Sequence, residues 1–466
     1  MSTLPARLPT LAEASAAIAA GATSPVILTE AAIARAEALQ PTLSAFITLA
    51  GDRAREAARR AEAEIAAGRK RGPLHGIPYA LKDIYDVAGL PTTAHSRLLR
   101  NNVAGEDAET TARLEAAGMI LIGKLATHEF ATGGPAWDTE WPPALNPWNL
   151  DHFPGGSSSG SGAAVAAGIV PMALGTDTSG SIRLPAAYCG VAGLKPTYGR
   201  VSRRGVVPLS FSLDHCGPLA ATVQDCALVM QALAGHDPRD PGAADQPVPD
   251  YSATLKNGVH GLRIGYAKAF NADAGVDAVQ SAALDEAARV FERLGAVVEE
   301  VALPPISLFN ACTRAISHGE SFAIHQKDLR ERPELYARVT RERLMMGAFV
   351  SSTQYVQAQR LRRRLTEAVD AVFEKHDLLL TATIPGAAPR MDEMETGPWR
   401  RNQQPITAVF NVTGHPALCQ PCGFSQNGLP LSLQLAGRNF DEATVLQAGH
   451  AYEQATPWLG RRPPLG

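Results

Sequence analysis

Short apolar segments of strand length alternate with helical segments beyond residue 76, and this alternation limits the folds open to the chain. Residues 77–87 have the composition of a strand that enters a loop, residues 107–117 that of a helix closed by Gly118, and residues 119–122 that of a short buried strand. Strands that alternate with helices belong to α/β folds, in which helices connect the strands and cover the sheet. The sequence therefore predicts an α/β fold.

The whole chain divides into four stretches. Residues 1–70 predict helices over 11–20, 25–39 and 52–67, the second of which should stop before Pro41 because proline interrupts a helix. Residues 71–235 form a core that carries the motifs below, and four prolines indicate a linker at about 236–256. The second half, 257–466, predicts strands and helices at 262–267, 276–294, 297–303, 353–375, 378–383, 417–422, 431–436 and from 442 onward. We expect one domain over 1–466, with both halves sharing one sheet.

Charge and composition exclude several classes of function. The 466 residues include 43 basic and 46 acidic side chains, so the surface offers no electrostatic case for nucleic acid or an acidic membrane as a partner. The arginine run at 360–364 is expected to be a solvated helix face. No apolar run reaches 18 residues and the first ten residues lack a signal sequence, which predicts no membrane span and a cytoplasmic location. A lone CxxC at Cys419 and Cys422 without a second pair predicts no metal, and we expect no cofactor.

Two glycine- and serine-rich segments carry the strongest candidate chemistry. Residues 154–162 contain a literal G-x-S-x-G with Ser158 at its centre, which leaves open a serine hydrolase that uses Ser158. Residues 175–181 are expected to form a second loop that ends at Ser181. Asp177 precedes this serine and Arg183 follows it. Successive backbone N–H groups in such a turn can bind an oxyanion, so Ser181 could act as nucleophile beside its own oxyanion hole.

A serine nucleophile needs a base, and Lys82 is the candidate. It lies in an apolar, strand-like segment at 76–86. Burial there would lower the pKa of its ammonium group and allow the amine to accept a proton near neutral pH.

These segments together closely resemble the amidase signature family. The resemblance is carried by residues 76–83, 155–168 and 175–187, is extended by 193–200, 214–218 and 428–437, and covers the chain from about 10 to 455, most weakly over 240–410. It implies an α/β/α sandwich, in which helices cover both faces of a mixed central sheet.

The resemblance also implies a Ser–cis-Ser–Lys triad. Lys82 matches the base, Ser157 the bridging serine that follows a cis peptide bond, and Ser181 the nucleophile, with the two serines 24 residues apart. The oxyanion-hole stretch matches Thr178, Ser179 and Gly180. Supporting positions match Ser158, Asp177 and Arg183.

The activity implied is hydrolysis of a small-molecule amide to a carboxylic acid plus ammonia or an amine, through an acyl-enzyme on Ser181. A partner-dependent chain similar to the glutamine amidotransferase A subunit is the alternative. The Tyr-Asp-Gly-Val-Arg-Tyr-Gly stretch associated with that subunit is absent, since residues 336–347 read differently. A homodimer is left open.

Aromatic residues crowd the segment between the lysine and serine motifs. We hypothesise that Phe130, Gly133, Trp137 and Trp141 line the acyl pocket and favour an apolar acyl group. The plainer interpretation is that the aromatic side chains pack their loop against the core. His318, Glu320 and Arg390 in the second half are expected at the surface.

Overall fold

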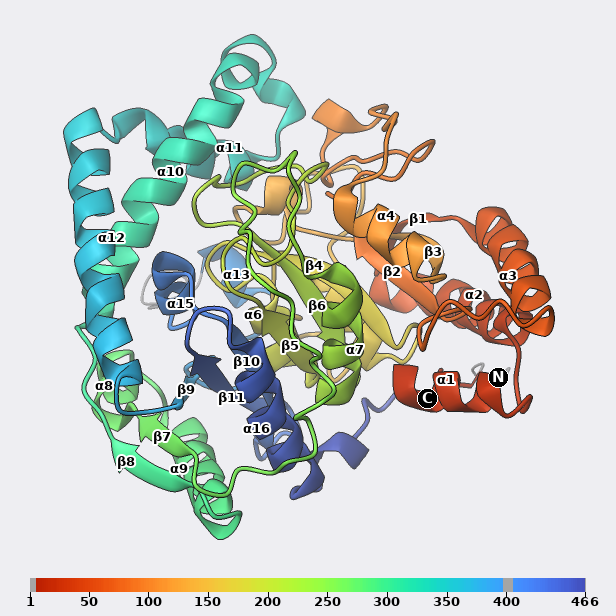
Figure 1. Ribbon diagram of the computed structural model, residues 1–466. Coiled ribbons are helices and arrows are strands. Elements are labelled where there is room, and N and C mark those ends of the chain that lie inside the picture. The colour runs from red at the N-terminus through yellow and green to blue at the C-terminus, as the bar shows by residue number, and fades with distance from the viewer. Residues whose placement is uncertain (1–5, 397–404, 466) are drawn as a thin grey trace.

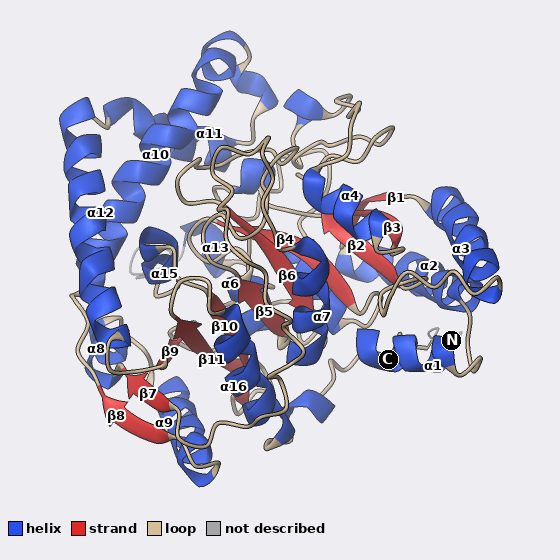
Figure 2. Cartoon of the chain, in the orientation of Figure 1, coloured by secondary structure: helices blue, strands red, loops and turns tan. Residues whose placement is uncertain are grey.

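The computed structural model describes residues 6–396 and 405–465, whose strands form a single mixed sheet (Figure 2). The strands follow the spatial order β1-β3-β2-β4-β6-β5-β10-β11-β9-β7-β8. Strand β2 is parallel to β3 and β4, and β7 is parallel to β8 and β9, whereas the remaining neighbours are antiparallel. The strands span β1 Phe46–Leu49, β2 Pro78–Lys82, β3 Ile120–Leu125, β4 Met172–Asp177, β5 Ala192–Lys195, β6 His215–Ala220, β7 Arg263–Tyr266, β8 Val297–Glu300, β9 Leu378–Ala382, β10 Ala417–Phe424 and β11 Pro430–Gly437.

Helices lie on both sides of this sheet (Figure 1). Their bounds are α1 Leu11–Ala19, α2 Pro25–Leu43, α3 Gly51–Ala66, α4 Glu109–Ala116, α5 Ser159–Ala166, α6 Arg183–Cys189, α7 Val223–Leu233, α8 Lys268–Asp273, α9 Ala278–Arg293, α10 Ile306–Glu331, α11 Arg338–Met345, α12 Ser352–Phe373, α13 Glu393–Thr396, α15 Ala408–Thr413 and α16 Glu442–Gln454. Short 3-10 helices are η1 Arg97–Leu99, η2 Glu129–Ala131, η3 Pro333–Leu335, η4 Met346–Phe349 and η5 Trp458–Gly460. No helix in the described ranges is long and apolar enough to cross a membrane.

Side chains that alternate along the strands divide the core between the two faces. In β2, Tyr79 and Leu81 pack in one apolar cluster with residues of α4, α7 and α16, whereas Ala80 packs in a second cluster with α2, α3, α5 and α6. Alternate residues of a strand point to opposite faces, so apolar side chains of this strand pack against helices on both faces of the sheet. The predicted α/β/α sandwich with a mixed sheet is confirmed.

Both halves of the chain contribute strands to this sheet. Strand β5 of the first half pairs with β10 of the second half, with Lys195 opposite Ala417. The proline-rich segment 236–256, expected to be a linker, runs without helix or strand, but Tyr251 within it is completely buried. Arg200 holds this segment through hydrogen bonds from Nη1 to the carbonyls of Gln246 and Pro247.

Two local predictions were wrong. Helix α2 continues past Pro41 to Leu43, since proline in the last turn removes only one N–H donor and the helix is closed by Ser44 with φ 48°. The expected loop at 175–181 begins only after Asp177, because residues 175–177 complete β4 and pair with β6.

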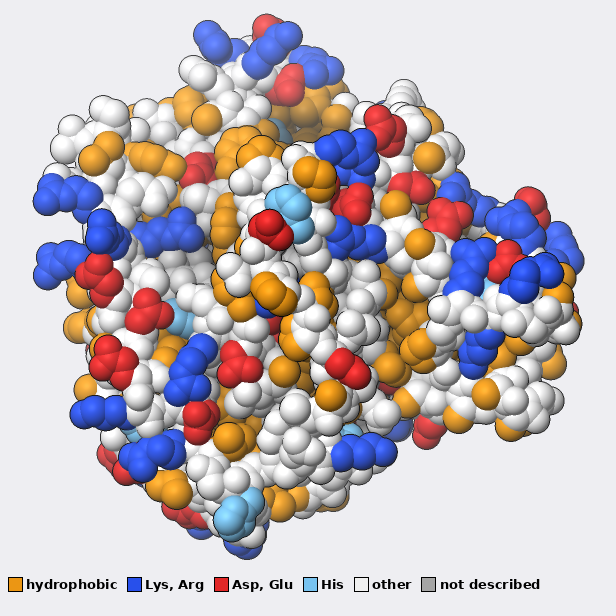
Figure 3. Space-filling model, viewed as in Figure 1, with side chains coloured by type: hydrophobic (Ala, Val, Ile, Leu, Met, Phe, Trp, Pro, Cys, Tyr) orange, Lys and Arg blue, Asp and Glu red, His pale blue; other side chains and the backbone are white. Residues whose placement is uncertain are grey.

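The arginine run lies on α12, as predicted. Figure 3 shows basic side chains along the α12 edge of the molecule, and Arg363 donates to Glu367 at 3.0 Å on the exposed side of this helix. One member is anchored to the core, since Arg362 donates from Nε to the Val412 carbonyl at 2.7 Å.

Candidate active site

Two parallel strands end at the same edge of the sheet and place the predicted residues there. Strand β2 ends at Lys82, and its parallel neighbour β4 ends at Asp177, directly before the turn that holds Ser181. Helix α5 begins at Ser159, which brings Ser157 to the same place. The Gly156–Ser157 peptide bond is cis, as the resemblance implied.

Lys82 is completely buried and contacts two hydroxyl groups. Its Nζ lies 2.7 Å from Ser157 Oγ and 2.8 Å from Thr176 Oγ1. Burial lowers the pKa of Lys82 to about 7, although the charges of Asp214 and Asp177 act in the opposite direction. The amine is therefore partly neutral at physiological pH and able to accept a proton.

Ser157 and Ser181 line one cavity of about 300 Å³. Ser181 is 8% exposed, and its hydroxyl forms no hydrogen bond among the described residues. The Ser181 hydroxyl is therefore open to a ligand in the cavity. Catalytic contacts of this kind are often loose until substrate is bound.

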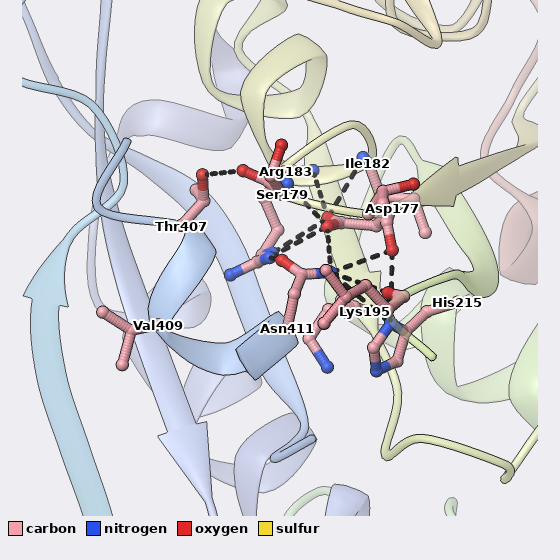
Figure 4. Close-up of polar contacts among 12 residues, drawn as sticks. Asp177, Ser179, Ile182, Arg183, Lys195, His215, Thr407, Val409 and Asn411 are labelled. Carbon is pink, nitrogen blue, oxygen red and sulfur yellow. Dashed lines mark hydrogen bonds and ion pairs between the residues drawn. The ribbon is translucent and has the colours of Figure 1, made fainter. Parts of the chain in front are cut away.

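Asp177 organises the turn that carries Ser181 (Figure 4). Its carboxylate accepts hydrogen bonds from the N–H groups of Gly180 and Ile182 at 2.7 and 3.2 Å, and from Arg183 Nε and Nη2 at 3.0 and 2.9 Å. Asn411 of α15 adds a bond of 2.9 Å from Nδ2. Burial alone would raise the pKa of Asp177, but Arg183 and the other donors hold that pKa far below its usual range. The carboxylate is therefore charged and fixes the turn.

The backbone donors of this turn differ in availability. The N–H of Gly180 already donates to Asp177, whereas those of Thr178, Ser179 and Ser181 have no acceptor within the described residues. Gly180 has φ 131°, and a Cβ there would lie 2.2 Å from Thr407 Oγ1, so only glycine fits. Three N–H groups therefore remain for an anion.

Ser158 is placed differently from Ser157, the residue before it. Its side chain is completely buried, and its Oγ lies 3.3 Å from both the N and the O of Thr176 in β4. It is not among the residues that line the 300 Å³ cavity. This position suits a structural contact between α5 and β4.

Of the four predicted pocket residues, only Gly133 lies on the cavity wall. Phe130 is buried against His325 and Tyr336, with ring centroids 4.4 and 5.5 Å away. Trp137 is 53% exposed, and Trp141 accepts a hydrogen bond at its carbonyl from His95 and packs edge-on against the His95 ring. Phe130 and Trp141 therefore pack within the protein, Trp137 is exposed, and none of these three aromatic side chains forms the wall of this cavity.

Several residues around the site were not predicted from the sequence. Thr176 contacts Lys82, and His128 lines the cavity with its backbone N–H donating to the Ser157 carbonyl at 3.0 Å. Burial, followed by the charge of Lys82, lowers the pKa of His128 to about 3, so this ring is neutral. His318, expected at the surface, also lines the cavity. No local pattern reveals these contacts, since each joins segments far apart in sequence.

Glu320 was also expected at the surface, and this prediction was wrong. It is 8% exposed and accepts hydrogen bonds from Ser212 Oγ at 2.6 Å and Tyr355 OH at 2.7 Å. It therefore ties α10 to the loop that ends at Asp214, whose carboxylate accepts a hydrogen bond from Thr178 Oγ1 at 2.6 Å. Arg390, by contrast, is half exposed and pairs with Asp392 at 3.2 Å, as expected.

The site has the layout of an enzyme that transfers an acyl group through serine. A buried lysine contacts one serine, a second serine shares the cavity, and the turn that carries it has three backbone N–H groups without an acceptor among the described residues. Within the described residues no cluster of three or more histidine, cysteine, aspartate or glutamate side chains could hold a metal ion.

Comparisons with known proteins give the family. The family model described as Amidase matches residues 27–446. The A subunit of the glutamyl-tRNA(Gln) amidotransferase from Anaeromyxobacter sp. (strain K) is 42% identical over 473 residues, covering 95% of each chain.

Solved structures agree with that match. A structure described as a vestigial protein complex that reveals the origins of an s-triazine catabolic enzyme is 36% identical, with a TM-score of 0.91 over 96% of this chain and 98% of that one. A bacterial aryl acylamidase of the amidase signature family is 30% identical, with a TM-score of 0.88 over 97% of both chains. The chain belongs to the amidase signature family and is an amide-cleaving enzyme.

Proposed function

We propose that the chain by itself hydrolyses a small amide, with Ser181 as nucleophile, Ser157 as proton relay and Lys82 as base. The observation that carries the proposal is the 2.7 Å contact between Lys82 Nζ and Ser157 Oγ in a buried site that also presents Ser181. We also propose that this reaction needs no cofactor, because serine, lysine and backbone N–H groups supply every step below.

The first half of the reaction acylates the enzyme. Neutral Lys82 takes the proton of Ser157 as Ser157 takes that of Ser181, and Ser181 Oγ attacks the amide carbon. The N–H groups of Thr178, Ser179 and Ser181 stabilise the negative oxygen of the tetrahedral intermediate. The proton then returns from Lys82 through Ser157 to the leaving nitrogen, the carbon–nitrogen bond breaks, and ammonia or an amine departs.

The second half releases the acid. Water attacks the ester on Ser181 and gives its proton to Lys82 through the same relay. Collapse of the second tetrahedral intermediate breaks the ester bond and returns a proton to Ser181. Each cycle therefore consumes one water and restores all three side chains.

A second candidate function is that of a catalytic subunit in a larger assembly. It is favoured by the curated relatives, which are amidotransferase A subunits 40–43% identical over 94–98% of this chain. The same residues would then release ammonia for use by a partner chain. The two candidates differ in whether the chain alone turns over an amide.

Ammonia release by the purified chain tests this proposal. We expect turnover of at least one primary amide in a panel from acetamide and malonamide to hexanoamide, benzamide, indoleacetamide and glutamine. Ser181→Ala and Lys82→Ala should each lower kcat by about 10³-fold or more. The three side chains act as a unit, so the loss of any one of them removes most of the rate enhancement. Ser158→Ala should retain activity.

The pattern of failure separates the alternatives. Silence of the wild-type chain across the panel, followed by activity with co-purified chains, would favour the larger assembly. Loss of activity in Ser158→Ala with retention in Ser181→Ala would assign the nucleophile to Ser158 and contradict the proposal.

A further inference from the structure

Helices α10 and α12 pack side by side, and a buried carboxylate between them reaches the first half of the chain (Figure 1). Glu320 of α10 accepts hydrogen bonds from four neutral donors, namely Tyr355 OH of α12, the N–H and the hydroxyl of Ser212, and the hydroxyl of Ser210. Three of the four donors belong to the loop at 209–214. A buried carboxylate is costly without its donors, so Glu320 holds this loop in place.

A second carboxylate joins the same loop to the catalytic turn. Asp214 Oδ2 accepts hydrogen bonds from the N–H groups of Leu209 at 2.8 Å and Ser210 at 2.9 Å. Its other oxygen, Oδ1, accepts a hydrogen bond from Thr178 Oγ1 at 2.6 Å. The loop that Glu320 holds is therefore connected to the turn between β4 and α6.

Thr178 is the point at which these contacts reach the site of reaction. It is 3% exposed and lines the cavity together with Ser181, and its N–H has no acceptor within the described residues. A donor that stabilises an oxyanion must lie about 2.7–3.1 Å from the negative oxygen. Even a small shift of Thr178 would therefore weaken this donor.

The other anchors of the turn lie beyond Thr178 in sequence. Asp177 accepts hydrogen bonds from the N–H groups of Gly180 and Ile182, and Thr407 donates to the carbonyl of Ser179 at 2.6 Å. The bond to Asp214 is the one hydrogen bond that the Thr178 side chain forms with the described residues. The start of the turn therefore depends on the loop at 209–214.

We propose that Glu320 is a positioning residue that keeps the Thr178 N–H directed at the oxyanion formed on Ser181. It acts through the loop at 209–214 and Asp214, since Glu320 is not among the described residues that line the cavity. The inference rests on the proposed function for the attack by Ser181, whereas the order of the turn can be measured without any reaction. It gives α10 and α12 a part in the reaction although neither helix carries a residue of the proposed triad.

Reaction with a fluorophosphonate tests this inference without knowledge of the substrate. Saturation kinetics of the labelling of Ser181 separate the maximal rate, kinact, from the concentration for half-maximal rate, KI. We expect Glu320→Gln to lower kinact about tenfold or more and to leave KI within about twofold, because the oxyanion donor acts in the transition state and not in binding. Equal kinact in Glu320→Gln and wild type would overturn the inference.

A milder variant covers the case in which Glu320→Gln does not fold. Tyr355→Phe keeps the ring and removes one of the four donors to Glu320. We expect a smaller fall in kinact, about two- to fivefold, again with KI unchanged. A fall in KI-dependent binding with kinact unchanged would contradict the assignment.

Asp225→Asn is the control for a general loosening of the fold. Asp225 is a completely buried carboxylate of α7 that accepts a hydrogen bond from the N–H of Ala12 at 3.1 Å, and it lies outside the cavity. This variant should lower stability and leave kinact of the folded protein unchanged. An equal fall of kinact in Asp225→Asn and Glu320→Gln would contradict a specific role for Glu320.

A double variant tests whether the contacts act in series. Thr178→Val removes the hydroxyl that donates to Asp214 and keeps a side chain of similar shape. If Glu320 acts through this bond, the double variant Glu320→Gln, Thr178→Val should have nearly the kinact of the slower single variant, since the two changes interrupt one path. Losses that multiply would overturn the proposed path.

Hydrogen exchange separates this inference from the proposed function. The peptide that covers residues 178–183 should exchange its amide hydrogens faster in Glu320→Gln than in wild type, with helices α2 and α3 unchanged. Unchanged exchange in this peptide would overturn the inference even if Ser181 is the nucleophile. Faster exchange, together with no labelling of Ser181 in wild type, would overturn the proposed function and leave the path from Glu320 to Thr178 standing.

Discussion

Lys82 is the residue on which the proposed proton transfers depend. It is completely buried, and its two hydroxyl partners are one predicted residue, Ser157, and one that was not predicted, Thr176. The motifs and the resemblance identify Lys82, Ser157 and Ser181 from the sequence alone. Thr176 and Asn411 could not be found in this way, since their contacts depend on how β4 and α15 meet the turn.

The pH dependence of the reaction is the prediction that belongs to this residue. Burial lowers the pKa of Lys82 to about 7, so protonation at acidic pH removes the base. We expect kcat/KM to rise with pH through about 7 and to level off above it. A rate that is constant or falls between pH 5 and 8, measured on a stable substrate, would contradict a lysine base.

At the scale of elements, the site depends on the turn between β4 and α6. The carboxylate of Asp177 gathers donors from this turn, from Arg183 and from Asn411 on α15 (Figure 4). Arg183 is in turn held by Gln434 of β11, at 2.7 Å from Nη1 to Oε1. Residues from both halves therefore fix the three backbone donors beside Ser181.

Replacing Asp177 tests this element. Asp177→Asn removes one charge of a completely buried pair and should destabilise the fold by about 3–5 kcal/mol, since Arg183 is left buried without its counter-charge. Asp392→Asn is the matched control, because Asp392 pairs with Arg390 at the surface and should change stability far less than Asp177→Asn does. Urea unfolding measures both changes, and equal stability of the two variants would contradict this role of Asp177.

Elements with clear periodicity were predicted and elements without it were missed. Helices α3, α9 and α12 lie within a few residues of their predicted bounds, because their apolar faces repeat at helical spacing. Strands β5 and β6 were missed because each is short and contains glycine, and β6 also contains Pro218. Their strand conformation depends on neighbouring strands in the sheet and not on local preference.

At the scale of the whole molecule, one sheet runs through both halves of the chain. Strand β10 lies between β5 of the first half and β11 of the second, so separating the halves would expose the edges of β5 and β10. We propose that residues 1–466 fold as one unit, with the 236–256 segment packed on its surface.

Equilibrium unfolding tests that proposal. We expect a single transition in urea, with tryptophan fluorescence and far-ultraviolet circular dichroism changing together. Two separate transitions, or a stable half released by proteolysis within 236–256, would show that the halves fold independently.

Covalent labelling of the active serine tests the central claim most directly, because it needs no knowledge of the substrate. The purified chain is treated with a fluorophosphonate, digested, and examined by mass spectrometry for the modified peptide. We predict modification of Ser181, at a rate that falls sharply in Lys82→Ala and persists in Ser158→Ala. Modification of Ser158 in place of Ser181, or an unchanged rate in Lys82→Ala, would contradict the proposed roles of Ser181 and Lys82.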